Sequence, residues 1–500
     1  MMKHLPISSL SMLIAVILLA GCASQTATPD NATVLTDMPS QWAAVDVEST
    51  AVANQATATW WQGFGSAELD SLMLQGLKNN PDLSMAAEHI VQAEAQARIA
   101  GASLFPVLEA NAGASRRETH GNSKQSTSQT STTTGDTGTN GTNGVTGTSG
   151  TDGGNTSLSL GLAASYEFDF WGKNAATRRA ADSLQQASSY DRDTLRLTLV
   201  GGIATAYFQI LAVRERLAVA QDNLAIARRV LQVVDARVRY GASGQLDLAR
   251  QRAAVLTQEA TIPPLQLQEQ QGLYALAILL GQVPPGFQVA GDQLRQVSLP
   301  AAAAGLPASL LHRRPDLASA EAQLAAANAN ISAARAALFP SISLSTSLGI
   351  ASDSLHGLLN APVTSFNLAA GLTQTIFDGG RLRAQVNIAE SRQRELLLAY
   401  RKAVLAALAD VDTALAASHR MQLQESLLQA YLQETEQALH LSEIRYRAGA
   451  DDLLVLLDAQ RSRFQAQDQL TQIRLSRLQA QIGLFKALGG GWQGAQSGTR

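Results

Sequence analysis

The chain is poor in charge, in aromatic residues and in cysteine. Only 16% of its 500 residues are charged, against about 25% in typical soluble domains. The 38 Lys and Arg nearly balance the 41 Asp and Glu, for a net charge of −3, which excludes nucleic-acid binding by bulk charge and an acidic tail. The single cysteine, Cys22, excludes a disulfide within the chain and a cysteine-rich metal site. With 5% aromatic residues, the composition favours long helices with narrow apolar seams.

Motifs of catalysis and metal binding are also missing. No two of the seven histidines lie within five residues of each other, so no local metal-ligand spacing exists. The sequence has no phosphate-binding loop, no Gly-x-Ser-x-Gly elbow and no His-Glu-x-x-His motif. We therefore expect no enzymatic activity, and the energy for any transport must come from a partner.

The first residues have the pattern of an export signal. The apolar run from Leu10 to Ala20 is too short to cross a bilayer but fits the core of a signal peptide. It runs into Leu19-Ala20-Gly21-Cys22, which resembles the lipobox of bacterial lipoproteins. This resemblance implies a signal peptide over 1–21 and N-acyl and S-diacylglyceryl groups on Cys22, with no other cofactor. Ala23, in place of Asp, favours passage to the outer membrane. No other stretch reaches 18 apolar residues, so we expect no transmembrane helix.

The chain repeats itself. Pro81-Asp82-Leu83 recurs as Pro315-Asp316-Leu317, and Leu104-Phe105-Pro106 recurs as Leu338-Phe339-Pro340, both at an offset of 234 residues. Farther along, Arg239, Gly241 and Leu280-Gly281 recur at an offset of 208. The first half therefore carries extra residues, which lie in a Ser/Thr/Gly/Asn-rich tract within 115–157. Such a composition cannot bury apolar surface and predicts a flexible loop.

This internal duplication divides the chain into segments. After the signal peptide we expect a lipidated N-terminal segment (22–65), a first repeat (66–282), a linker (283–306), a second repeat (307–489) and a C-terminal tail (490–500). In each repeat a helical stretch, 66–104 or 307–338, precedes two strands, a very long helix and a shorter helix that closes at a Leu-Gly pair.

Four segments alternate between apolar and polar residues. The pattern is clearest over 158–170 and 341–350 and weaker over 107–116 and 366–377. A period of two gives each strand one apolar and one polar face, and these lengths suit tilted strands that cross a membrane. On alternation alone a soluble, half-buried sheet is an equal alternative, and the lipoprotein signal favours the membrane. Four strands cannot close a channel, and an open sheet edge is forbidden in lipid. We therefore expect three chains to build one barrel of twelve strands.

Two proline-free stretches, 174–240 and 381–447, predict very long helices. Each has 67 residues, about 100 Å of helix. A seven-residue apolar repeat from Leu199 to Val238 has the spacing of a left-handed coiled coil. The matching positions from Ala407 to Tyr446 are apolar except at Ser418, Glu425, Thr435 and Ser442. Because strands lead directly into these helices, an outer-membrane barrel would continue into a helical tube.

Together these motifs resemble the TolC-like outer membrane factors of efflux systems, in their lipoprotein (NodT-type) branch. The resemblance covers about 55–492 and also uses the segments Leu311 to Leu317, Phe377 to Arg381, Leu457 to Arg461 and Leu488 to Trp492. It implies a mixed α and transmembrane β fold: a homotrimer with a twelve-stranded outer-membrane barrel, continued by a periplasmic α-helical coiled-coil tunnel. It also implies docking to a periplasmic adaptor and an inner-membrane efflux pump. The channel would lie in the outer-membrane lipid, with a large periplasmic part, and would passively export drugs or other small molecules.

The turns after the two long helices are the expected docking points. We predict that Gly241 and Ala242 in one turn, and Gly449 and Ala450 in the other, form periplasmic tips that contact the adaptor. The alternative is that glycine merely ends the helices there.

A gate is expected beside the second turn. Leu454, Asp458 and Arg461 fall at i, i+4 and i+7, on one helical face, and a trimer repeats each of them three times around its axis. The family resemblance implies that Asp458 contributes to the constriction and that Tyr446 and Asp247 help to hold it shut. The alternative for Asp458 with Arg461 is an exposed ion pair of little energetic value.

Two other classes of protein compete with the efflux channel. One is a trimeric coiled-coil surface adhesin or structural lipoprotein, and the other is a lipid-anchored periplasmic enzyme. Conductance in a planar bilayer separates them, since only the channel passes ions. The sequence identifies neither the exported substrates nor the pump.

Overall fold

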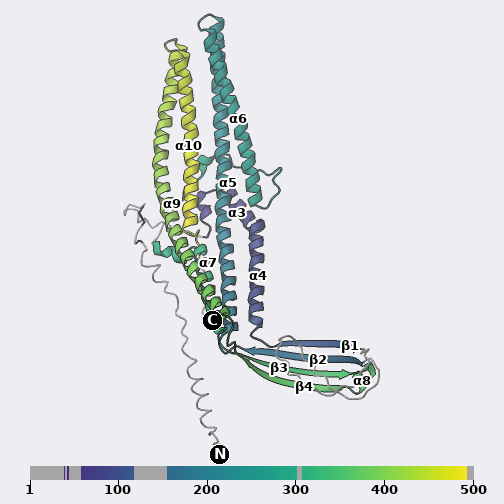
Figure 1. Cartoon of the computed structure of the whole chain (residues 1–500). Helices are drawn as coiled ribbons and strands as arrows, with labels where there is room; N and C mark the ends of the chain where they lie inside the picture. The colour runs from purple at the N-terminus through teal and green to yellow at the C-terminus, as the bar shows by residue number, and fades with distance from the viewer. Residues whose placement is uncertain (1–38, 40–41, 44–57, 118–154, 301–306, 493–500) are drawn as a thin grey trace, which may run out of the picture. The chain divides into compact units, whose positions relative to one another are not determined.

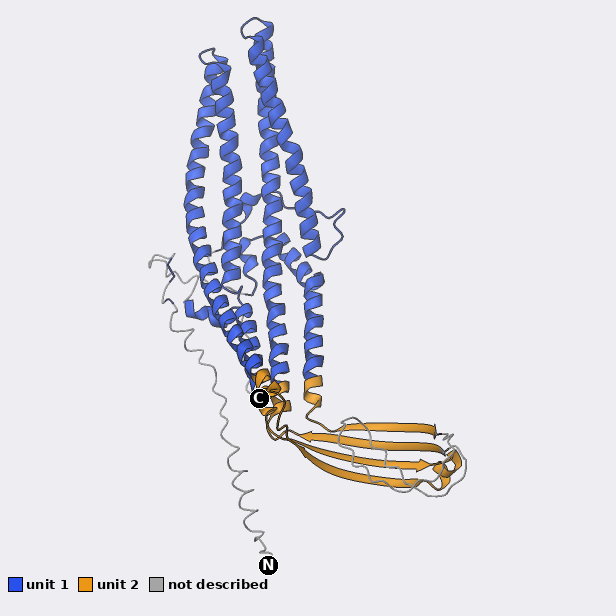
Figure 2. Cartoon of the chain, in the orientation of Figure 1, with its two compact units in different colours: residues 1–98, 178–332, 387–500 blue, residues 99–177, 333–386 orange. Residues whose placement is uncertain are grey.

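The computed structural model describes residues 39, 42–43, 58–117, 155–300 and 307–492 (Figure 1). The chain divides into two compact units, which Figure 2 colours separately. The helical unit comprises 1–98, 178–332 and 387–500, and the strand unit comprises 99–177 and 333–386. The predicted signal peptide, Cys22 and most of the predicted loop 115–157 lie outside the described residues.

The elements of the first half are η1 (Trp60–Phe64), α3 (Ala67–Asn79), α4 (Pro81–Ala102), β1 (Val107–Arg117), β2 (Asn155–Phe168), α5 (Lys173–Arg239) and α6 (Gln245–Leu279). The linker contains η2 (Leu294–Gln296). The second half contains η3 (Pro307–His312), α7 (Pro315–Ala336), β3 (Ser341–Ser352), α8 (Leu355–Asn360), β4 (Val363–Thr373), α9 (Arg381–Arg447) and α10 (Leu453–Ala487).

This order confirms the predicted duplication. Each half has two strands, a helix of 67 residues and a helix of 35 residues. The predicted helical stretches 66–104 and 307–338 were wrong as continuous helices, because each is interrupted just before a proline. Proline lacks a backbone N–H and is accommodated in the first turn of a helix. Pro81 and Pro315 therefore begin new helices, and Asn80 caps the first of them by accepting a hydrogen bond from Leu83 N at 3.0 Å.

The strand unit is an antiparallel sheet in the order β1-β2-β3-β4. Its register pairs Leu162 with Leu348, and Leu348 with Phe366, so the apolar positions of neighbouring strands share one face. Leu108 and Phe366 on that face are each 71% exposed. The opposite face carries mostly Ser, Gly, Ala and Asn. An apolar sheet face that no described residue of the unit covers is suited to lipid.

The strand ends differ from their predicted positions. Residue 117 and segment 155–157, predicted as loop, extend the β1–β2 pairing as far as Arg117 opposite Asn155, and 115–116, where the predicted strand and loop overlapped, are strand. The strand predicted over 158–170 stops at Phe168, because the Asp169 carboxylate turns to accept hydrogen bonds from Asn174 N and Ala175 N at the start of α5. The strand predicted over 366–377 lies at 363–373, where Thr373 faces Ser341, the first residue of β3.

The predicted coiled-coil seams lie on the inward faces of α5 and α9. Ile203, Ile210, Ala220 and Val234 are almost completely buried. In α9 the polar seam residues Glu425, Thr435 and Ser442 are buried too. The Thr435 and Ser442 hydroxyls donate to backbone carbonyls one turn back, at 2.9 Å each. Thr435 and Ser442 are therefore satisfied members of the seam.

Glu425 is the charged member of this seam. Its side chain is 8% exposed. It forms ion pairs with Arg474 at 3.0 Å and with Arg477 at 2.6 Å, both on α10. Removing one partner of a buried ion pair typically costs about 3–5 kcal/mol. The pair of arginines therefore fixes α9 against α10.

The two pairs of recurring motifs meet in the structure. In the first half, the Asn80 side chain donates a hydrogen bond to Leu279 O at 2.9 Å. Gly281, just after α6, has φ 67° and packs closely against the backbone carbonyl of Asn79. In the second half, Arg314 donates a hydrogen bond to Ala487 O at 3.3 Å. Gly489, just after α10, has φ 86° and packs closely against the backbone carbonyl of Arg313. Each Leu-Gly pair thus closes a joint with the residues that precede a Pro-Asp-Leu motif.

One helix in the described part of the chain, α5, contains an 18-residue window apolar enough to cross a membrane by length and composition. Within the helical unit, 61% of that window is buried. It packs in the main core, where Ile203 and Phe208 meet Phe64 and Phe485. The window therefore reflects a core helix.

Candidate functional site

The two helix turns have the same backbone design. Gly241 has φ 73° and Gly449 has φ 77°, in the left-handed region that favours glycine. The following alanines donate back to the last turn of the helix, from Ala242 N to Arg237 O at 2.7 Å and from Ala450 N to Arg445 O at 2.9 Å. A side chain added at Gly241 or Gly449 meets no atom within 4 Å. The predicted tip residues therefore stand free on compact turns.

The surroundings of the two tips differ. Tyr240 at the first tip is 89% exposed. At the second tip the Arg445 guanidinium donates two hydrogen bonds of 2.8 Å to the Asp451 carboxylate. These hydrogen bonds lower the pKa of Asp451. One tip thus presents an aromatic ring and the other a fixed ion pair.

Tyr446 lies inside the bundle just before the second tip. It is 4% exposed and packs with Val234, Leu248 and Leu453, so it contacts side chains from the other long helices. Burial raises the pKa of its hydroxyl. That oxygen has no hydrogen-bond partner among the described residues.

Near the tips, Arg237 ties the first half of the chain to the second by linking α5 to α9. Its guanidinium donates from α5 to the backbone carbonyl of Tyr446 at 2.8 Å and lies 4.8 Å from the centre of the Tyr446 ring. A hydrogen bond between Tyr446 and Asp247 is not present, because the Asp247 carboxylate accepts from Ser243 at 2.6 Å within its own turn. Sequence reasoning missed Arg237. A basic residue in the last turn of a helix is a common partner for carbonyls at a helix C-terminus.

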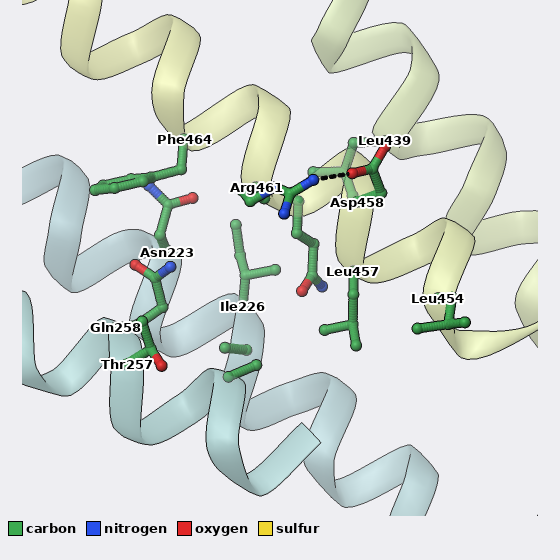
Figure 3. A pocket seen from close by; sticks show the side chains of 13 residues that line it. Asn223, Ile226, Thr257, Gln258, Leu439, Leu454, Leu457, Asp458, Arg461 and Phe464 are labelled. Carbon is green, nitrogen blue, oxygen red and sulfur yellow. Dashed lines mark hydrogen bonds and ion pairs between the residues drawn. The ribbon is translucent and has the colours of Figure 1, made fainter. Parts of the chain in front are cut away.

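Three of the five predicted gate residues line one groove of about 540 Å³ in the helical unit (Figure 3), and Tyr446 and Asp247 do not. Leu454, Asp458 and Arg461 all face it from α10, as their spacing predicts. Arg461 is hydrogen-bonded to Asp458, and their side chains are 68% and 64% exposed. In a single chain this contact is the exposed ion pair foreseen as the alternative, worth about 1 kcal/mol or less.

The opposite wall of the groove was not predicted from the sequence. It includes Asn223 and Ile226 from α5 and Thr257 and Gln258 from α6. Arg463, two residues after Arg461 on α10, donates to Asn223 Oδ1 at 3.2 Å and lies 3.8 Å from Asp222. Together with Arg237, this network joins the second helix pair to the first at two levels.

No group of three or more His, Cys, Asp or Glu side chains suited to a metal ion occurs in the part of the chain that the structure describes.

The sequence pattern of the "Outer membrane efflux protein" family matches residues 72–282 and 306–490. The chain is 41% identical over 495 residues to the pyoverdine export outer membrane protein OpmQ of Pseudomonas aeruginosa, covering 98% of both chains. It is 31% identical over 446 residues to the cation efflux system protein CusC of Escherichia coli, covering 89% of this chain and 90% of CusC.

Solved outer membrane channels share the fold. The CmeC outer membrane channel of Campylobacter jejuni superimposes with a TM-score of 0.80 at 25% identity, over 92% of this chain and 93% of CmeC. The open state of the MtrE outer membrane channel of Neisseria gonorrhoeae gives 0.77 at 30% identity, over 91% of this chain and 96% of MtrE.

Proposed function

Because this chain belongs to the outer membrane efflux protein family, it is a subunit of a trimeric exit channel in the outer membrane, and we propose that its two helix tips dock this channel onto a periplasmic adaptor. The adaptor would connect it to an inner-membrane pump, which supplies the energy. The channel itself carries out no chemical step.

The observation that carries this function is the four-stranded sheet with one exposed apolar face. In lipid its edge strands β1 and β4 must find partners, because unpaired N–H and C=O groups are too costly there. Three copies close the sheet into twelve strands, which leaves an aqueous lumen lined by the serine- and glycine-rich face.

The support for docking at the tips is geometric. Both turns are compact, both present small residues, and both recur through the duplication. Two turns with the same backbone in each of three chains present six sites of one backbone geometry, although the side chains around the two turns differ. Neither turn makes a contact that would compete with a partner at Gly241 or Gly449.

Single cysteines test the docking. The chain has one native cysteine, Cys22, so Ala242→Cys or Ala450→Cys adds one defined thiol. We expect a thiol-reactive cross-linker in intact cells to join either variant to an adaptor. Thr177→Cys, on an exposed surface at the other end of α5, lies about 95 Å of helix from the tip and is the matched control. Equal cross-linking from Thr177→Cys would contradict docking at the tips.

We also propose that Cys22 carries the acyl groups of a lipoprotein. The support is the position of the only cysteine directly after an apolar run and Leu-Ala-Gly. Each buried CH₂ of an acyl chain adds about 0.8 kcal/mol of membrane affinity. Mass spectrometry of the mature N-terminal peptide is expected to show Cys22 as the first residue with lipid attached. An unmodified peptide that begins elsewhere would refute this assignment.

The names of the relatives bear on the substrate. OpmQ is named for pyoverdine export, CusC for cation efflux and TtgC, 31% identical over 493 residues, as a probable efflux pump outer membrane protein. Because relatives with one fold are named for different cargoes, we propose that the pump and adaptor choose the cargo. The higher identity to OpmQ supports a pump and adaptor like those that OpmQ serves in pyoverdine export.

A further inference from the structure

The polar face of the sheet is nearly free of charge. Strands β3 and β4 contain no Asp, Glu, Lys or Arg over Ser341–Ser352 and Val363–Thr373. On β2 the polar face carries one charged residue, Glu167, and on β1 it carries Glu109 and, at the far end, Arg117. The electrostatic character of this face therefore depends on three positions in each chain.

Two of these three positions contribute little to the field near Glu109. Glu167 is neutralised by Lys173, whose Nζ lies 2.8 Å from its Oε1. Arg117 is eight residues farther along β1, about 27 Å at 3.4 Å per residue, which is more than three Debye lengths at physiological salt (about 8 Å).

Glu109 remains as the uncompensated charge. Its carboxylate is exposed and has no hydrogen-bond or ion-pair partner among the described residues. It borders a shallow groove whose other walls are Ala163, Ser165, Ser347 and Asn367, none of them charged. In the trimer, β1 pairs with β4 of the next chain, and no residue of β4 is charged, so no register of that pairing neutralises Glu109.

We propose that Glu109 gives the barrel lumen a preference for cations over anions and makes it a selectivity-determining residue of the duct. The inference rests on the trimeric channel described above. Twelve strands spaced about 4.8 Å apart and tilted by about 40° close a barrel about 24 Å across. Three carboxylates on such a wall are too far apart to share one ion, so they act through their combined field. At 0.1 M salt the Debye length of about 10 Å carries the field of Glu109 most of the way to the axis of the lumen but still screens Arg117, whereas at 1 M it is about 3 Å and the field is screened.

The test is the reversal potential of purified full-length trimers in planar bilayers under a tenfold KCl gradient. With the gradient centred near 0.1 M KCl the wild-type channel is expected to favour K⁺ over Cl⁻ severalfold, and the preference should fade towards 1 M salt. Glu109→Gln should lower the permeability ratio at least twofold, Glu109→Lys should bring it below one, and Glu109→Asp should retain it. The double variant Glu167→Gln/Lys173→Met removes a neutral pair and is expected to match the wild type.

Asp458→Asn separates this inference from the gate, because it removes the carboxylates beside the tip. If Glu109→Gln kept the wild-type ratio while Asp458→Asn abolished it, selectivity would lie at the gate and the inference would be wrong. A selectivity change in Glu167→Gln/Lys173→Met equal to that in Glu109→Gln would also overturn it. If trimers passed no current either as wild type or as Arg237→Ala/Asp458→Ala, which is expected to open the gate, the duct itself would be contradicted, and the inference with it. A native gel for every variant verifies that the trimer is present.

Discussion

Replacing Arg237 and Asp458 together with alanine is expected to raise the single-channel conductance of the purified trimer severalfold. Arg237 ties α5 to α9 through its hydrogen bond to Tyr446 O and its contact with the Tyr446 ring. A hydrogen bond from a charged donor contributes about 2 kcal/mol, so a closed state held by this tie loses about 6 kcal/mol over three chains relative to an open state in which the tie is already broken. A shift of about 5.5 kcal/mol inverts a two-state equilibrium from 1:99 to 99:1.

Removing Asp458 adds to this effect if its three copies converge on the axis. Two like charges 4 Å apart cost about 4 kcal/mol at an effective dielectric constant of 20. A closed ring therefore needs compensation, and Arg461 supplies it within each chain. Without the carboxylates, the three Arg461 guanidinium groups lose their partners, so a closed ring is left with three unpaired positive charges that repel one another.

Tyr446→Phe is the matched control. It keeps the backbone carbonyl and the ring that Arg237 contacts and removes only a hydroxyl with no partner among the described residues. We expect its conductance to equal that of the wild type. Cells with the Arg237→Ala/Asp458→Ala variant should become more sensitive to bulky antibiotics, and the trimer should persist on a native gel. If Tyr446→Phe opened the channel and Arg237→Ala/Asp458→Ala did not, the tie would belong to the hydroxyl.

Much of the fold follows from local patterns in the sequence. The alternation in 341–350 depends on one strand and its two faces, and the structure extends that strand by only two residues, to Ser352. The seven-residue repeat from Ala407 to Tyr446 places even Glu425 on the buried face. Periodicity identifies such faces because the spacing of side chains along a helix or strand is fixed.

The site was predicted less completely, because it depends on partners that are distant in sequence. Spacing placed Leu454, Asp458 and Arg461 on one face, and they do line one groove. Spacing does not reveal which long side chain reaches across from another helix. Asp247 reaches Ser243 four residues away, whereas Arg237 reaches Tyr446 across 209 residues. A flexible arginine has many rotamers, so its partner is fixed only by tertiary packing.

Substituting Gly489 by alanine is expected to lower the apparent melting temperature of the trimer strongly, and Gly281→Ala should do the same. Both residues have positive φ, where a side chain costs about 1–2 kcal/mol. The added methyl group would also overlap a backbone carbonyl, that of Arg313 or of Asn79. A backbone atom cannot move aside as a side chain does, so the joint between the helix end and the Pro-Asp-Leu motif has to open.

An opened joint also loses the hydrogen bond from Arg314 to Ala487 O, or that from Asn80 to Leu279 O. Asn80 is 2% exposed, and a buried polar group left unpaired costs about 1–3 kcal/mol. The total destabilisation is then about 3 kcal/mol or more per chain.

Gly483→Ala is the matched control, since Gly483 lies within α10 and an added methyl group there meets no atom within 4 Å. Alanine in a helix interior is favoured over glycine by about 0.5–1 kcal/mol, so this variant should melt at or above the wild-type temperature. Because Gly281 and Gly489 occupy matching joints in the two repeats, they should shift the melting of heat-treated trimers on a gel in the same direction. A Gly489→Ala trimer as stable as Gly483→Ala would show that the joint tolerates displacement, and the recurring Leu-Gly pair would then need another explanation.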